Sequence, residues 1–177
     1  MKLPPYIMVF DVEAMGFHGV AFAVGCVVLD TGDWREMDRR KWRCNPDTLP
    51  ATVEDRAWVD QNCSHLREVG YCDSAAVMRD LFWSFWGYWK TQGAWLAADV
   101  PWPVESNFLS ACIADDPVKR QWAAPYPLLD IASLGVGKGW DPLAQHARIW
   151  PDEQPEHDPL ADSHQSARLL KQILADQ

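Results

Sequence analysis

The segment YIMVFDVEAMG at residues 6–16 is a short apolar run that ends in acidic residues. Such a run predicts a β-strand over residues 6–12 that delivers polar groups to the edge of a sheet. Asp11 and Glu13 are two residues apart, so their side chains share one face of this strand. Adjacent carboxylates repel each other unless a cation, a proton or water offsets their charge, and Mg²⁺ or Mn²⁺ does so because it prefers oxygen ligands. Taken alone, D-x-E at a strand end is a weak indication, because most such pairs are simply exposed.

Two further strands are expected directly after the first. Gly16 and Gly19 mark a turn, and residues 20–29 form an apolar run that is typical of a fully buried strand. Thr31-Gly32-Asp33 is a hairpin signal, and residues 34–44 alternate large and charged side chains as a partly exposed strand does. The first three strands are therefore expected to be antiparallel.

The rest of the chain alternates between helical and extended patterns. Helices are expected over residues 51–62, 73–91, 103–114 and 159–175, a strand over 94–98, an apolar element over 128–134, a turn over 135–139 and a loop over 150–156. The core face of the second helix is predicted to consist of Val77, Leu81, Phe82, Phe85, Trp86 and Trp89, which recur at helical spacing. Since there are no internal repeats and no long linkers, we expect a single α/β domain over residues 1–177.

The composition limits the class of protein. With 177 residues, 48% hydrophobic and 23% charged, the chain has the size and composition of one globular domain. The net charge of −9 argues against a protein that coats long duplexes by neutralising their phosphates. Five cysteines without paired spacing indicate free thiols in a reducing compartment, so we expect a cytoplasmic protein. No apolar run reaches the length of about 20 residues that a membrane span needs, and we expect no membrane partner.

A second group of polar residues lies near the end of the sequence, in the run HDPLAD at residues 157–162. Asp158 is a good N-cap and Pro159 a good first helical residue, so a helix should begin here. His157 would then lie just before the helix, where it can accept a proton from water, and Asp162 about one turn inside it. The alternative is a surface histidine followed by a helix with an acidic first turn.

The order of these motifs resembles that of the DEDDh-type 3′→5′ exonucleases, which include oligoribonuclease, RNase T and the proofreading subunits of DNA polymerases. The matching segments are FDVE at residues 10–13, HDPLADS at 157–163 and LLDIA at 128–132. The resemblance implies an RNase H-like fold, in which helices flank a mixed central sheet. It also implies an enzyme that hydrolyses the 3′ end of single-stranded RNA or DNA and releases nucleoside 5′-monophosphates.

The middle motif departs from the family pattern of a strand, an asparagine and an aromatic–aspartate pair that opens a helix. The sequence ADVPWPVESNFL at residues 98–109 occupies its place. Asp99 keeps the expected residue type at a strand end, whereas Glu105 is nearer the family's position relative to the following Phe-Leu. Each also has a structural explanation, since Asp99 could be a turn residue and Glu105 could complement the helix dipole. We favour Asp99 and expect at least one of the two at the metals.

The resemblance implies two Mg²⁺ or Mn²⁺ ions in each active site and assigns roles to the matching residues. Asp11 would bridge both ions, Glu13 and Asp162 would complete the first, and the middle acid, Asp99 or Glu105, would hold the second. A reference pKa of about 6.5 suits a histidine that deprotonates the attacking water. The catalytic set is therefore expected to contain Asp11, Glu13, Asp99, His157 and Asp162.

Substrate contacts are expected beside the first and middle motifs. Met15 and Phe17 follow D-x-E where this family contacts the last nucleotide, and Trp102 could stack on a base. The alternatives are loop packing for Met15 and Phe17 and a buried position for Trp102. The expected partner is a single-stranded nucleic acid 3′ end, and the tryptophan-rich stretch 82–89 could support a homodimer. Two other functions stay open: a catalytically impaired nucleic-acid-binding protein with the same fold, and a phosphodiesterase of short oligonucleotides.

Overall fold

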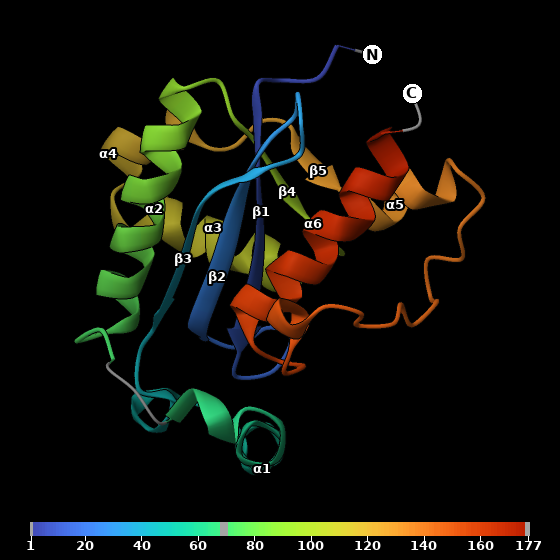
Figure 1. The fold of residues 1–177 in the computed structure, drawn as a ribbon. Coiled ribbons are helices and arrows are strands. Elements are labelled where there is room, and N and C mark those ends of the chain that lie inside the picture. Colours follow the sequence, from blue (N-terminus) through green and yellow to red (C-terminus); the bar gives the residue numbers. More distant parts are fainter. Residues whose placement is uncertain (1, 68–70, 176–177) are drawn as a thin grey trace.

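The computed structural model describes residues 2–67 and 71–175, and a single mixed sheet forms its centre (Figure 1). The strands are β1 (Tyr6–Ala14), β2 (Ala21–Asp30), β3 (Glu36–Arg43), β4 (Trp95–Ala98) and β5 (Leu128–Asp130), in the order β3-β2-β1-β4-β5. β2 pairs antiparallel with β1 and with β3, whereas β4 is parallel to β1 and β5 to β4. The predicted antiparallel arrangement of the first three strands is therefore confirmed.

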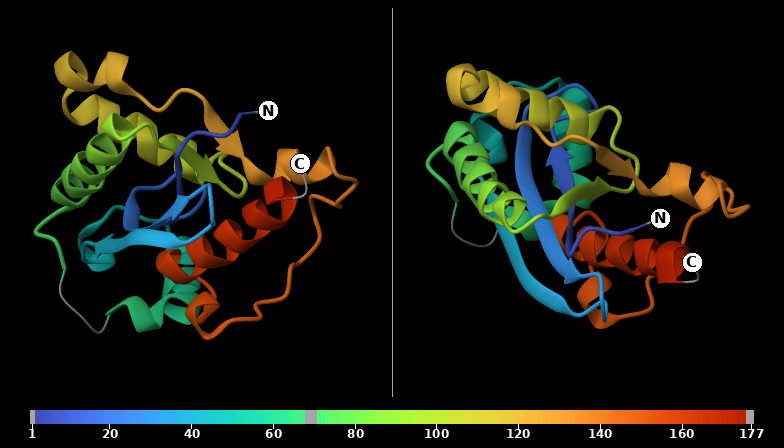
Figure 2. Two further views of the ribbon diagram at one scale, coloured as in Figure 1. Left: turned by 45° about the horizontal axis from the view of Figure 1, so that its top comes forward. Right: turned by 90° about the horizontal axis from the view of Figure 1, so that it is seen from above.

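Helices cover both faces of this sheet (Figure 2). α6 (Pro159–Ala175) lies across one face, while α2 (Ala75–Thr91) and α3 (Val104–Asp115) pack against the other. Within residues 2–67 and 71–175, no helix is both long enough and apolar enough to cross a membrane. The shorter elements are α1 (Val53–Asn62), α4 (Pro117–Arg120), α5 (Ile131–Val136) and the 3-10 turns η1 (Pro46–Thr48), η2 (Ser64–Arg67), η3 (Gln121–Ala123) and η4 (Pro151–Glu153).

The alternation of side chains along β1 decides which core each of them enters. Phe10 and Val12 are buried with residues of α2 and α3, whereas Val9 is buried with residues of α6. Because successive side chains of a strand point to opposite faces, Asp11 and Glu13 continue the series of Val9. Both acids therefore emerge on the side of the sheet that α6 covers.

The first turn of α6 rests directly on the backbone of β2 at Gly25. A Cβ atom at Gly25 would lie 2.3 Å from the Leu160 nitrogen and 2.3 Å from the Pro159 carbonyl carbon, closer than side chains pack. At the same contact, the Ser163 hydroxyl donates a hydrogen bond of 3.1 Å to the Gly25 carbonyl oxygen. Because Gly25 pairs with Asp11 in the β1–β2 register, the contact brings the start of α6 beside the acidic end of β1.

The predicted start of this helix is confirmed. Oδ1 of Asp158 accepts hydrogen bonds from the amides of Leu160 at 3.0 Å and Ala161 at 3.4 Å, as an N-cap does. Its other carboxylate oxygen binds Nζ of Lys41, on β3, at 2.5 Å. The capping residue therefore also ties the beginning of α6 to the sheet.

The buried face of α2 differs from the predicted one. Val77 and Leu81 are 40% and 42% exposed, whereas Met78, which the predicted face omits, is fully buried. The buried stripe shares Phe82, Trp86 and Trp89 with the predicted face and is rotated from it by less than the angle of about 100° that separates successive residues. Its members are Ala75, Met78, Phe82, Trp86 and Trp89. Most large side chains of the stretch 82–89 thus fill the protein's own core, and the homodimer stays a prediction.

Two later segments carry more structure than the sequence predicts. The apolar element at 128–134 consists of β5 followed directly by α5. Asp130 is the last residue of β5, and its side chain caps α5 by accepting a hydrogen bond of 2.9 Å from the Ser133 amide. α5 continues through Gly135, so the turn predicted at 135–139 begins inside it. The predicted loop at 150–156 contains η4 and buries Glu153, which pairs with Arg168 of α6 at 2.6 Å.

Replacing Gly25 with alanine tests how closely α6 is seated. The added methyl group cannot fit unless the helix backbone moves, so we expect the free energy of unfolding to fall by about 2–3 kcal/mol. Urea denaturation followed by circular dichroism measures this change. Gly87→Ala is the matched control, because nothing lies within 4 Å of the added Cβ on α2, and alanine should stabilise that helix by up to about 1 kcal/mol. Equal stability of G25A and the wild type would contradict the close contact.

Candidate active site

Residues from the two ends of the sequence meet where β1 ends, beside the N-terminus of α6. Ligand atoms of Glu13, His157 and Asp162 all lie within 4.8 Å of one another. Glu13 belongs to β1, His157 to the loop before α6, and Asp162 to the first turn of that helix. The structure thus brings the first and last acidic motifs into one cluster.

The neighbours of His157 hold its imidazole in one orientation. Its backbone adopts a φ of 59°, in the left-handed region, and the Trp58 ring of α1 packs edge-on against it at a centroid distance of 4.9 Å. Nδ1 lies 3.6 Å from Oε1 of Glu13, and the interaction with this nearby carboxylate raises the pKa of His157. With Nδ1 turned toward Glu13, Nε2 is the ring atom that remains to accept a proton.

Asp11 has the most strongly perturbed electrostatic environment of the cluster. Burial raises its pKa well above the ordinary value, and the charges of Asp162, Glu105 and Glu13 raise it further, in that order. Buried like charges of this kind are unfavourable unless protons or cations compensate them. The site therefore has a strong electrostatic demand for positive charge.

Of the two candidate acids in the middle motif, Glu105 is a member of this cluster. It lies in the first turn of α3 and is only 7% exposed. Burial raises its pKa to about 7, although the backbone amides of Glu105 itself and of Val12 oppose this shift. The charge of Glu105 raises the pKa of Asp11 more than that of Glu13 does.

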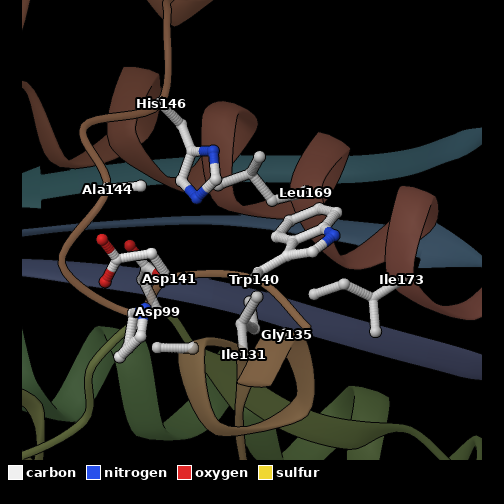
Figure 3. Close-up of a pocket in the computed structure, with 11 residues that line it drawn as sticks. Asp99, Ile131, Gly135, Trp140, Asp141, Ala144, His146, Leu169 and Ile173 are labelled. Carbon is white, nitrogen blue, oxygen red and sulfur yellow. The ribbon is translucent and has the colours of Figure 1, made fainter. Parts of the chain in front are cut away.

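Asp99 lies instead in the wall of a neighbouring groove. Asp141 and His146 line the same groove (Figure 3). Burial raises the pKa of Asp99, and the charge of His146 opposes that shift. Among the acids that act on Asp11, Asp99 raises its pKa least. Asp99 thus raises the pKa of both Asp11 and Glu105, and its effect on Asp11 is smaller than that of Glu105.

A positively charged side chain of the protein, Arg148, reaches the cluster. The Arg148 guanidinium pairs with the Asp162 carboxylate and donates a hydrogen bond of 2.6 Å to the Glu153 carbonyl oxygen. Burial still raises the pKa of Asp162 to about 6, because desolvation outweighs the opposing effect of Arg148. The ion pair therefore compensates only part of the buried negative charge.

The three residues predicted to contact substrate differ in exposure. Met15 is 2% exposed and packs in the core beneath the turn after β1, whereas Phe17 and Trp102 are 74% and 69% exposed. The Asn107 side chain of α3 donates a hydrogen bond of 3.3 Å to the Phe17 carbonyl oxygen, which ties this turn to α3. The buried position considered for Trp102 is wrong.

Three residues at the site are absent from the sequence-based prediction: Arg148, Trp58 and Lys41. Trp58 and Lys41 are distant in sequence from both motifs, and Arg148 lies outside the last motif in the segment before it. The stretch around Arg148 has no periodicity, and Trp58 and Lys41 look like ordinary members of a helix and an exposed strand. No local pattern in the sequence identifies them.

Comparison with solved structures assigns the fold. No protein family model and no curated protein matches the chain. The nuclease domain of 3′hExo, a DEDDh family member, superposes with a TM-score of 0.58 at 15% identity over 99% of this chain and 94% of that one. The chain has the fold of the DEDDh exonucleases. A full-length 3′-exonuclease (TM-score 0.66, 17% identity) and the zinc-bound E. coli ExoI–ssDNA complex (0.68, 12%) each match 99% of this chain.

The DEDDh fold confirms the predicted RNase H-like class, with a mixed sheet flanked by helices. The chain spans 62% of the length of the full-length 3′-exonuclease and 41% of that of the E. coli ExoI chain.

The donor set of the cluster fits divalent cations. Carboxylate oxygens are the ligands that Mg²⁺ and Mn²⁺ prefer, and the raised pKa values of Asp11, Glu105 and Asp162 show that the cluster is short of positive charge. Glu13 and His157 add donor atoms within reach of Asp162. The four carboxylates are the groups that would hold metal ions, and His157 lies beside them.

The pH dependence of stability tests the buried acids. A carboxyl group whose pKa is raised on folding holds its proton in the folded state after the unfolded chain has lost it, so stability decreases as pH rises through the folded pKa. For Glu105 this window lies between the ordinary value of 4.5 and about 7. With a chelator present, we expect the free energy of unfolding from urea denaturation to fall from pH 5 to pH 8.

Glu105→Gln should remove part of this slope and raise the free energy of unfolding at pH 8 by about 1–3 kcal/mol. Glu54→Gln, on the exposed first turn of α1, is the control and should keep the wild-type slope. If the wild type and E105Q showed the same pH dependence, Glu105 would not be a member of a strained buried cluster.

Proposed function

We propose that residues 1–177 form one exonuclease domain that hydrolyses phosphodiester bonds at the 3′ end of single-stranded nucleic acid and releases nucleoside 5′-monophosphates. The observation that carries this proposal is the convergence of Asp11, Glu13, Glu105, His157 and Asp162 at one end of β1 in a DEDDh fold. The molecules bound in two of the matching structures add support, because one holds rAMP and another holds ssDNA.

The cofactor of this reaction would be Mg²⁺ or Mn²⁺, two per active site. Bound cations of this kind polarise the scissile phosphate and stabilise the leaving 3′ oxygen. Asp11 would help to hold both, because the charges of the other acids act on its carboxyl group. Glu13 and Asp162 would complete one position, and the acid of the middle motif the other.

His157 is the proposed general base. Its Nδ1 faces Glu13, which fixes the ring and leaves Nε2 to take a proton from the attacking water. The water oxygen forms a new bond to phosphorus while the bond from phosphorus to the 3′ oxygen of the preceding nucleotide breaks. The phosphate then stays on the released nucleotide as a 5′-monophosphate, and the 3′ oxygen is protonated from solvent.

Exposed aromatic side chains beside the cluster are the proposed contacts to the terminal bases. Phe17 and Trp102 project from the two segments that flank the acids, and Met15 packs beneath the same turn as Phe17. Stacking on aromatic rings accepts any base, which suits an enzyme that removes nucleotides one after another.

Nucleotide release from 5′-labelled 20-mers tests the proposed function. Matched RNA and DNA strands are incubated with Mg²⁺, with Mn²⁺ or with a chelator, and we expect a ladder of products shortened one nucleotide at a time in either metal. Glu13→Gln should lower the rate by about 100-fold or more, because it removes a charge from the metal site. Full activity of E13Q in Mg²⁺ would overturn the proposal.

The same assay separates the two alternative functions. A phosphodiesterase of short oligonucleotides would prefer a dinucleotide to the 20-mer, and a catalytically impaired binding protein would retain the strand without cleaving it. The relative rates on RNA and DNA define the sugar preference, which depends on contacts to the 2′-hydroxyl.

We propose that Glu105, in preference to Asp99, is the cation-binding acid of the middle motif. Its carboxylate is buried in the cluster and acts strongly on Asp11. Glu105→Gln should therefore lower kcat by about 100-fold or more, whereas Asp99→Asn should change it by less than about tenfold. Each variant removes one negative charge, so each is a control for the other. A larger loss of kcat in D99N than in E105Q would assign the role to Asp99.

A further inference from the structure

The segment of residues 141–156, named here the strap, runs beside α6 and ends next to the acidic cluster (Figure 1). Several hydrogen bonds fasten it to that helix. The Gln165 side chain donates to the His146 carbonyl oxygen at 2.7 Å, and Arg168 donates to the Ala147 carbonyl oxygen at 2.7 Å. Arg168 also pairs with Glu153, whose side chain is 1% exposed. The backbone on both sides of Arg148 is thus held in place by groups other than Arg148.

The Arg148 side chain points from the strap into the cluster. It pairs with Asp162, and the two side chains are only 15% and 14% exposed. Its Nη1 donates to the Glu153 carbonyl oxygen at 2.6 Å, which orients the guanidinium toward Asp162. A desolvated ion pair of this kind occupies one oxygen of a carboxylate that the proposed function needs as a cation ligand.

The same arginine borders an open groove next to the cluster. The groove has a volume of about 480 Å³, and its wall includes Arg148, Asp99, Gln145 and Gln154. A strand of nucleic acid that approaches the cluster along this side would bring phosphate oxygens within reach of the guanidinium. Arginine is well suited to such an exchange, because its planar donors bind carboxylates and phosphates alike.

We propose that Arg148 is a positioning residue that competes with divalent cations for Asp162. When strand and cations bind together, its guanidinium moves from Asp162 to a nucleic-acid phosphate. This inference rests on the proposed function. A positive charge at hydrogen-bonding distance from Asp162 both occupies an oxygen ligand and repels an incoming cation. Cation binding and strand binding each release Arg148 from Asp162 and therefore favour each other.

The binding of Mn²⁺ alone, measured by titration calorimetry at pH 8, is the first test. Arg148→Gln should bind Mn²⁺ about tenfold more tightly than the wild type, because the competing charge is gone. Arg148→Lys keeps the charge and should stay close to the wild type. Arg35→Gln makes the same charge change at a side chain that is 67% exposed, and Arg168→Gln loosens the strap without removing Arg148. Neither control should shift the affinity by more than about twofold.

The binding of a single-stranded 12-mer in Ca²⁺, followed by fluorescence anisotropy at several salt concentrations, is the second test. R148Q should bind about tenfold more weakly, and the slope of log affinity against log salt should fall by about 0.7, which corresponds to the loss of one phosphate contact. R148K should largely restore both values.

Three results would overturn the inference. They are an unchanged or weaker Mn²⁺ affinity in R148Q, a shift of equal size in R168Q, and an unchanged salt slope in strand binding. If the wild type cleaves strands and binds Mn²⁺ and R148Q gives the same binding results, only this inference is overturned. A wild type that neither binds Mn²⁺ nor cleaves any strand defeats the proposed function as well.

Discussion

The contact between Gly25 and the first turn of α6 is the constraint on which the rest of the site depends. Only a residue without a side chain lets the Pro159–Leu160 backbone rest on β2. Because Gly25 is the strand partner of Asp11, this contact fixes the distance between the first and last motifs. The N-cap at Asp158 then sets where the helix begins, and both His157 and Asp162 follow from that point.

Electrostatic strain is the second feature that links structure to chemistry. The acids converge on a buried position, where burial and mutual repulsion raise the pKa values of Asp11, Glu105 and Asp162. Such a cluster opposes folding near neutral pH and at the same time favours the binding of cations. Arg148 relieves part of the strain from within the protein through its ion pair with Asp162.

The sequence predicts those parts of the site that depend on local structure. Asp11 and Glu13 follow from strand alternation, and the start of α6 follows from the capping preference of Asp158. The middle acid cannot be chosen this way, because the choice depends on where α3 begins relative to β1. Arg148 escapes prediction for a similar reason, since the strap has no periodicity and its position is set by side chains of α6. On α2, a small error in the direction of the buried face exchanges Val77 for Met78.

Anomalous diffraction from a crystal grown with Mn²⁺ and a nucleoside 5′-monophosphate would show whether this acidic cluster is a two-cation site. We expect two manganese peaks among Asp11, Glu13, Glu105 and Asp162, with the Arg148 guanidinium moved from Asp162 to the phosphate. The absence of any peak at these carboxylates, or a single peak confined to the groove beside Asp99, would contradict it.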